Sequence, residues 1–170
     1  MIFLIQSFDG ILKIMKGFSA LCGGSFFFYV GVLHFTDTSW FEPIVPPIFG
    51  SARFWVLASG VAEIFVGLGL IISGLEIFFS SGHYFRAKAG LASALLLIML
   101  YPANLYMWIY DIELGDGASL SPTGHVVRLL LQIGGIFLSL WIAGFKFQSS
   151  RHTVKTARII RIRGKRLEEV

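Results

Sequence analysis

The sequence predicts an all-α fold, an integral-membrane four-helix bundle with an N-terminal interfacial amphipathic helix and a basic C-terminal tail. Hydrophobic residues make up 55% of the 170 residues and charged residues only 14%, whereas an ordinary soluble domain has about 25% charged residues. Of the 14 basic and 10 acidic residues, ten lie in residues 146–170 and fourteen in the first 145. A surface so poor in charge would not stay soluble, which excludes a water-soluble enzyme.

Four apolar stretches are long enough to cross a membrane, which takes about 20 helical residues. They are Gly17–Phe35, Phe54–Phe79, Ala89–Tyr110 and Gly124–Phe145. The alternating pattern of a membrane β-barrel is absent, and a backbone within lipid must satisfy its own hydrogen bonds, so each stretch is expected to be a helix. These spans predict one bundle domain over residues 17–147.

The distribution of basic residues predicts the orientation of the bundle. Lys13 and Lys16 precede the first span, Arg86 and Lys88 join the second to the third, and eight basic residues lie in residues 146–170. The connections at the opposite side carry five acidic residues, Asp37, Glu42, Asp111, Glu113 and Asp116. Both termini are therefore expected on the cytoplasmic side of a bacterial membrane, or on the matrix side of the mitochondrial inner membrane.

Two ends of the chain are predicted to lie outside the bundle. Residues 1–16 place apolar side chains on one helical face and polar ones on the other, which is typical of an interfacial helix on a membrane surface. Residues 148–170 contain the basic run Arg158–Arg166. We expect this tail to touch anionic lipid headgroups, with a docking arm for an acidic partner as the alternative. Nothing else in the sequence supports nucleic-acid binding.

The candidate site residues are polar side chains within the spans, namely His34, Glu63, Asn104, Arg128 and Gln132. Polar and ionisable groups in lipid are costly and usually face the bundle interior. Glycines and serines share their helical faces, and small residues let helix backbones approach closely. We therefore expect all four faces to meet in one polar cavity in the outer half of the membrane. A long arginine can bend toward a deeper carboxylate, so Glu63–Arg128 is the expected ion pair.

These polar residues leave three interpretations open. The groups could only satisfy one another and set the helix register. They could instead line a cavity that binds a quinone headgroup, a small anion or a lipid headgroup. A bis-histidine haem held by His34 and His125 is a third interpretation, although the spacing carries no haem signature. The single cysteine, Cys22, excludes an internal disulfide and a thiolate-held metal cluster within this chain.

Prolines mark two irregular segments. Residues 36–50, between the first two spans, are apolar but contain Pro43, Pro46 and Pro47, so they cannot form one regular helix. Such a segment should lie at the membrane interface or fold over the bundle as a lid. Pro102 in the third span has no backbone N–H, which frees a carbonyl group about one turn earlier, near Ile98, and is expected to kink the helix.

Several blocks occur in a fixed order along the chain: His34–Phe35 with Phe41, Ile44–Pro47, Ser59–Gly60 with Glu63, Gly67–Leu70, Pro102–Met107, and Arg128–Leu129 with Gln132. This series, over residues 17–147, resembles the DoxX-like family of small four-helix membrane proteins. The resemblance implies a four-helix bundle and a tie to membrane redox systems, because the family takes its name from a subunit linked to thiosulfate:quinone oxidoreduction. It also marks the five candidate residues as the positions most expected to matter.

The sequence therefore favours an accessory subunit or assembly factor of a larger membrane complex, with a respiratory or redox complex as the expected setting. Its partners would be other integral-membrane subunits and lipids. The alternative is a quinone-reactive oxidoreductase component, in which His34 or Glu63 exchanges protons and Arg128 stabilises reduced quinone. Quinone is thus the candidate cofactor. A lipid- or solute-binding transporter is a third possibility, which the lack of an inverted repeat disfavours.

Overall fold

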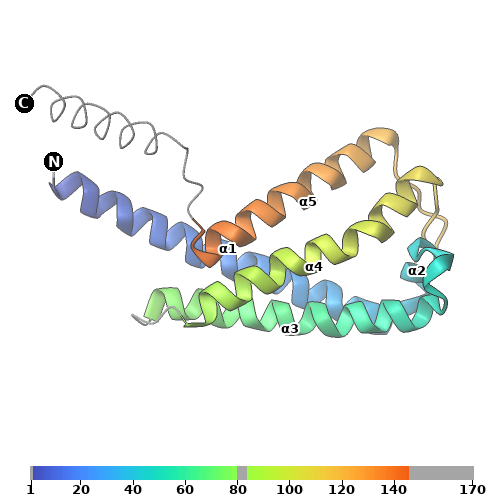
Figure 1. Ribbon diagram of the computed structural model, residues 1–170, viewed down its shortest axis with the longest axis horizontal. Coiled ribbons are helices and arrows are strands. Elements are labelled where there is room, and N and C mark those ends of the chain that lie inside the picture. Colours follow the sequence, from blue (N-terminus) through green and yellow to red (C-terminus); the bar gives the residue numbers. More distant parts are fainter. Residues whose placement is uncertain (1, 80–83, 146–170) are drawn as a thin grey trace, which may run out of the picture.

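The computed structural model describes residues 2–79 and 84–145, and this part of the chain is helical without strands (Figure 1). The elements are α1 (Ile2–Thr36), α2 (Thr38–Phe41), the 3-10 helices η1 (Glu42–Ile44) and η2 (Pro47–Phe49), α3 (Ala52–Phe79), α4 (Tyr84–Ile109) and α5 (Pro122–Ala143). Four of the helices are long and apolar enough to cross a membrane. The predicted all-α membrane bundle is confirmed. The basic tail over residues 148–170 lies outside the described residues.

The first helix differs from its prediction in one respect. Residues 1–16 were expected to form an interfacial helix separate from the first span, but α1 runs without a break from Ile2 to Thr36. No proline interrupts this stretch, and Gly10 and Gly17, the glycines nearest the expected boundary, are too weak as helix breakers to end the helix. The amphipathic start and the first span are therefore one helix, whose N-terminal part projects beyond the rest of the bundle (Figure 1).

Helices α1 and α3 pack through a seam of glycines, which we call the glycine seam. Glycines recur at every seventh residue on both helices and face each other in antiparallel order: Gly31 with Gly60, Gly24 with Gly67, and Gly17 with Gly74. A Cβ atom on Gly24 would lie 2.7 Å from the carbonyl oxygen of Gly67, and one on Gly31 would lie 2.8 Å from that of Gly60. The two backbones are therefore in contact, and no larger residue fits between them.

Helices α4 and α5 form a second antiparallel pair that is joined through side chains. Near the start of α4, the hydroxyl groups of Ser93 and Ser139 lie 2.9 Å apart and are hydrogen-bonded. Gly90 gives the closest backbone approach of the pair, since a Cβ there would lie 2.5 Å from the Ser139 carbonyl oxygen. Toward the other end, Asn104 of α4 and Gln132 of α5 form a second hydrogen-bonded pair. We call these two pairs, Ser93–Ser139 and Asn104–Gln132, the polar seam.

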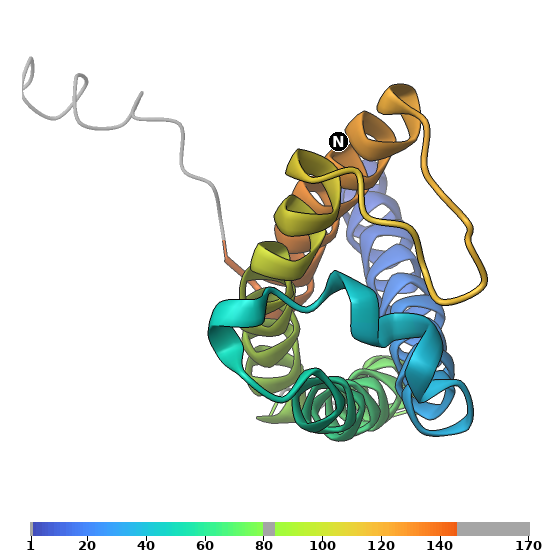
Figure 2. The ribbon, with the colours of Figure 1, turned by 90° about the vertical axis from the view of Figure 1, so that its right-hand side faces the viewer.

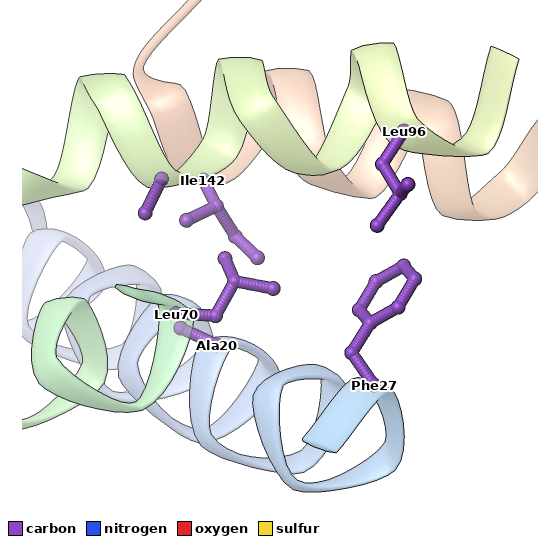
Figure 3. Close-up of a cluster of buried hydrophobic side chains, with 6 residues drawn as sticks. Ala20, Phe27, Leu70, Leu96 and Ile142 are labelled. Atoms are coloured by element: carbon purple, nitrogen blue, oxygen red, sulfur yellow. The ribbon is translucent and has the colours of Figure 1, made fainter. Parts of the chain in front are cut away.

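A small hydrophobic core joins the two helix pairs, α1 with α3 and α4 with α5, which we call the two hairpins. Its buried members come from all four long helices: Ala20, Phe27, Leu70, Ala89, Leu96 and Ile142. Figure 3 shows Ala20, Phe27 and Leu70 meeting Leu96 and Ile142 across the space between the two hairpins. Ala89 lies near the start of α4 and Ile142 near the end of α5, so the core extends toward the end of the bundle opposite α2. The polar groups near the α2 end lie beyond it.

The proline-containing segment between α1 and α3 crosses one end of the bundle (Figure 2). This is one of the two placements predicted for it. The loop between α4 and α5 is attached to it, because the Gly115 backbone N–H donates to the Trp40 carbonyl oxygen at 3.1 Å. The next residue, Asp116, accepts from the Ala118 backbone N–H at 3.0 Å. The Gly115–Trp40 bond ties the α4–α5 loop to the α1–α3 connection, whereas the Asp116–Ala118 bond shapes the loop itself.

Candidate functional site

The structure divides the five candidate residues between the two hairpins. His34 and Glu63 meet at the end of the glycine seam, and Asn104, Arg128 and Gln132 meet along the polar seam. We call these groups the His–Glu cluster and the amide–arginine cluster. The prediction of one cavity shared by all five side chains is therefore wrong.

The His–Glu cluster is buried between α1 and α3. The Nδ1 atom of His34 lies 2.8 Å from the Val30 carbonyl oxygen and 3.4 Å from Oε2 of Glu63. The exposed fractions of the two residues are only 7% and 3%. Phe41 of α2 stacks on the imidazole with ring centroids 4.0 Å apart and an interplanar angle of 16°. The imidazole is thus held on one side by a ring and on another by a backbone carbonyl.

The carboxyl group of Glu63 is the less satisfied member of this cluster. Its Oε2 atom is buried and has no hydrogen-bond partner among the described residues. A nearby imidazole at 3.4 Å is a weaker stabiliser than a well-aligned hydrogen bond. A carboxyl group beside an imidazole in a membrane interior can hold or transfer a proton, so the cluster has the groups that proton transfer requires.

The amide–arginine cluster begins with two amides that satisfy each other. Nδ2 of Asn104 donates to Oε1 of Gln132 at 2.6 Å. Nε2 of Gln132 donates to the Leu97 carbonyl oxygen, one residue before the carbonyl that Pro102 deprives of its usual donor. Neighbouring helices commonly supply donors to the backbone around a membrane proline. This arrangement fixes the register of α5 against α4.

Arg128 points to α4 rather than to Glu63. Its Nη1 atom donates to the Met107 thioether sulfur at 2.9 Å, which is a weak acceptor. No carboxylate lies within ion-pair distance of it in residues 9–79 and 85–145. The predicted Glu63–Arg128 ion pair is therefore wrong.

The two residues are separated because each follows the packing face of its own hairpin. Glu63 lies three residues after Gly60 and four before Gly67, so the glycine seam turns it toward α1. Arg128 lies four residues before Gln132 and shares the face of α5 that meets α4. The polar side chains of each helix pair thus contact groups within that pair.

A cavity opens beside the amide–arginine cluster. This small hollow is partly open to the surroundings and is lined by eight residues of α4 and α5: Tyr101, Asn104, Leu105, Trp108, His125, Arg128, Leu129 and Gln132. His34 and Glu63 are not among them. The cavity therefore carries three of the five candidate residues, and the His–Glu cluster stands apart from it.

Sequence reasoning missed two contacts at this cavity. Met107 is the acceptor for Arg128, and His125 stacks on Trp108 with ring centroids 5.8 Å apart and planes 3° from parallel. The sequence suggests His125 only as a haem ligand together with His34, but His125 lines the cavity and His34 does not. Within the described residues, no group of three or more His, Cys, Asp or Glu side chains could hold a metal ion. The spacing along α4 and α5 could have suggested the antiparallel pairing of Trp108 with His125, but not the thioether contact.

The carboxyl group of Asp116, in the loop between α4 and α5 and outside the spans, has a shifted pKa. The Ala118 backbone N–H and then the Trp40 side chain hold the pKa of the exposed Asp116 carboxyl below its usual range. The negative charge of Asp116 thus favours the docked position of the loop between α4 and α5.

A comparison with protein families gives one match. The model of a family described as a domain of unknown function, DUF8561, matches residues 24–143. The matched region begins within the glycine seam and ends at the last residue of α5, so it contains both polar clusters. No curated protein and no solved structure matches the chain.

Proposed function

We propose that this chain, which belongs to the DUF8561 family, is an accessory subunit or assembly factor of a larger membrane complex, with a respiratory or redox complex as the expected setting. The observation that carries the proposal is the surface of α5. Only 17% of its most apolar window is buried inside the bundle, against 33% for α3. A span with so little internal packing has most of its surface available to other membrane helices.

The outward face of α5 has a shape that suits a partner helix. Large apolar side chains are exposed along it: Val127, Leu130, Leu131, Phe137 and Leu138. Gly134 lies among them, and a Cβ there would meet nothing within 4 Å. The glycine leaves a notch in a bulky face, and such notches let a second backbone approach in membranes, where van der Waals packing drives helix association.

The interior of the bundle supports a structural role. The buried amides of Asn104 and Gln132 bond to each other, and the hydroxyls of Ser93 and Ser139 do the same. These side chains set helix register and leave the chain rigid enough to serve as a scaffold. The resemblance of the polar blocks to DoxX-like proteins supports a redox complex as the partner.

The proposed placement follows from charge. Four apolar helices make this a multi-pass membrane protein, and the basic residues favour a bacterial cytoplasmic membrane or the mitochondrial inner membrane with both termini on the cytoplasmic or matrix side. Under this proposal, the end of the bundle that carries α2 faces outward.

Native electrophoresis of gently solubilised membranes tests the scaffold proposal. Gly134→Leu fills the notch without touching the fold and should shift the tagged chain from a large complex to a small species. Gly10→Leu is the matched control, because Gly10 also has nothing within 4 Å but lies outside the α5 face. Co-migration of the wild type and both variants as one small species would contradict the proposal.

A quinone-reactive oxidoreductase component is the second candidate, and the His–Glu cluster favours it. The unpartnered Oε2 of Glu63 beside the His34 imidazole is suited to exchanging protons with a quinone oxygen. Glu63→Gln separates the two functions, with the loop variant Glu42→Gln as its control. An assembled complex with lost quinone turnover would favour the quinone role, whereas normal turnover in the complex that still forms would exclude it.

A further inference from the structure

We propose that the cavity at the end of the polar seam binds the phosphate group of an anionic phospholipid, with Arg128 as the main contact. The proposal goes beyond the scaffold function and does not depend on it. It assigns a ligand to the amide–arginine cluster, whereas the proposed docking face lies on the outward side of α5.

Arg128 lacks a counter-charge among the described residues. The guanidinium group is half-buried, and its hydrogen bond goes to the uncharged Met107 sulfur. In the part of the chain that the structure describes, no carboxylate reaches it. An arginine within a membrane span is costly unless an anion accompanies it. The geometry therefore leaves a positive charge that an external anion would neutralise.

The cavity wall is rich in hydrogen-bond donors. Trp108, Tyr101 and His125 line the cavity together with Arg128, and each carries an N–H or O–H group. The amide N–H groups of Asn104 and Gln132 are already used within the polar seam. No aspartate or glutamate lines the cavity. A wall with one fixed cation, several donors and no carboxylate suits an oxyanion such as phosphate.

The cavity lies toward the N-terminal end of α5. Arg128 lies six residues after Pro122, the first residue of α5, which corresponds to a depth of about 9 Å at 1.5 Å per residue. A long arginine side chain can reach from that depth to the level of the lipid phosphates. Tyr106 and Tyr110 lie at the same end, with ring centroids 4.9 Å apart, as expected for the aromatic belt at a membrane interface.

The apolar part of the wall distinguishes a lipid from free phosphate. Leu105 and Leu129 line the cavity beside the polar groups, and exposed Ile109 lies one turn after Leu105 on α4. A phospholipid would place its phosphate against Arg128 and its glycerol and upper acyl chain along these leucines. Free phosphate would gain nothing from that surface.

Native mass spectrometry of the purified full chain in detergent tests the role of Arg128. With added phosphatidylglycerol, the wild type should retain a lipid that Arg128→Gln binds about tenfold more weakly, because a charged hydrogen-bonding partner is lost. Arg53→Gln is the matched control, since Arg53 is exposed at the start of α3 near the same end of the bundle. Equal retention by the wild type and both variants would overturn the proposal. Equal loss in both variants would reduce the effect to general charge attraction and would overturn it as well.

A second measurement uses the unmodified chain and does not depend on whether Arg128→Gln folds. Phosphatidylglycerol with a photoreactive headgroup should label peptides within residues 101–108 or 125–132. Inorganic phosphate at millimolar concentration should not compete, and phosphatidylcholine should compete less than phosphatidylglycerol. Labelling confined to other peptides would overturn the site. Complete competition by inorganic phosphate would show that the cavity takes the free ion, and the lipid proposal would then be wrong.

Discussion

The helices within each of the two hairpins are joined by different kinds of contact. Along the glycine seam, α1 and α3 lie backbone to backbone and leave no room for side chains between them. Along the polar seam, α4 and α5 are joined by the hydrogen bonds of Ser93 with Ser139 and of Asn104 with Gln132. The first pair is thus close-packed at three glycine positions, whereas the second makes a close backbone contact at Gly90, is joined by polar side chains farther along, and has a cavity near its other end.

This difference is matched by the burial of the helices. The most apolar windows of α1 and α3 are 28% and 33% buried, whereas those of α4 and α5 are 22% and 17% buried. The bundle therefore combines a closely packed helix pair with a pair that is less buried and has a cavity between its helices. Ligand and partner contacts are therefore expected on α4 and α5.

The largest expected effect is a substitution within the glycine seam. Gly24→Leu would drive a side chain into the Gly67 carbonyl and the Ile71 backbone N–H, at 2.7 and 2.8 Å from the Cβ position. Because backbone cannot rotate away as a side chain can, we expect the free energy of unfolding to fall by about 3 kcal/mol or more. Denaturation in mixed micelles measures it.

The neighbouring glycine is the control for this prediction. Gly23 has nothing within 4 Å of its Cβ position, so Gly23→Leu should leave stability within about 0.5 kcal/mol of the wild type or raise it slightly, because leucine favours helix more than glycine does. Similar losses in both variants would show that α1 and α3 do not meet along the glycine seam.

A smaller effect is expected in the polar seam. Gln132→Leu leaves the Asn104 amide without its acceptor and the Leu97 carbonyl without its side-chain donor. We expect a loss of about 1–2 kcal/mol in the free energy of unfolding. The double variant Asn104→Leu with Gln132→Leu should lose less than the sum of the single variants, because the partners are removed together. Strictly additive losses would mean that the amides do not bond.

A single added methyl group should weaken the contact of Gly115 with Ser39 and Trp40. A Cβ on Gly115 would lie 2.5 Å from the Ser39 carbonyl oxygen and 2.8 Å from the Trp40 Cα. Gly115→Ala should therefore release the loop and cost about 1 kcal/mol. Faster proteolysis between α4 and α5, with the helices unchanged by circular dichroism, would report it. A loop as protected as in the wild type and in Gly10→Ala would contradict the docking.

The smallest effect is the pH response of the same loop. The pKa of Asp116 is lowered in the folded state by the Ala118 backbone N–H and the Trp40 side chain. The stabilisation is therefore present above the unfolded-state pKa and is lost as the pH falls through the lowered folded-state pKa. Acid titration of tryptophan fluorescence should show a step below the usual aspartate range. Asp116→Asn should lack this step, and identical titrations of the two chains would remove Asp116 from the contact.

The fold could be predicted from composition because lipid leaves few choices. Long uncharged stretches must be helices in a membrane, and the four spans follow from that constraint alone. The continuity of α1 across residue 16 could not be predicted, because an amphipathic pattern says which face is polar but not where a helix ends. The pairing of α1 with α3 was present in the seven-residue glycine repeats on both helices, a signal that only their comparison could have revealed.

The candidate site could be predicted only in part. Polarity within apolar spans identified all five residues, and three of them line the cavity. Their grouping could not be predicted, because the direction of Glu63 depends on which helix contacts Gly60 and Gly67. The weak Met107 acceptor for Arg128 leaves no signal in the sequence, since methionine is an ordinary core residue.

The central claim is that the His–Glu cluster and the amide–arginine cluster are separate. A double-mutant cycle of Glu63→Gln and Arg128→Gln, read as the free energy of unfolding in mixed micelles, tests it most directly. Separate clusters predict additive changes within about 0.5 kcal/mol. A coupling energy of about 1 kcal/mol or more would show that the two side chains interact and would contradict this division of the bundle.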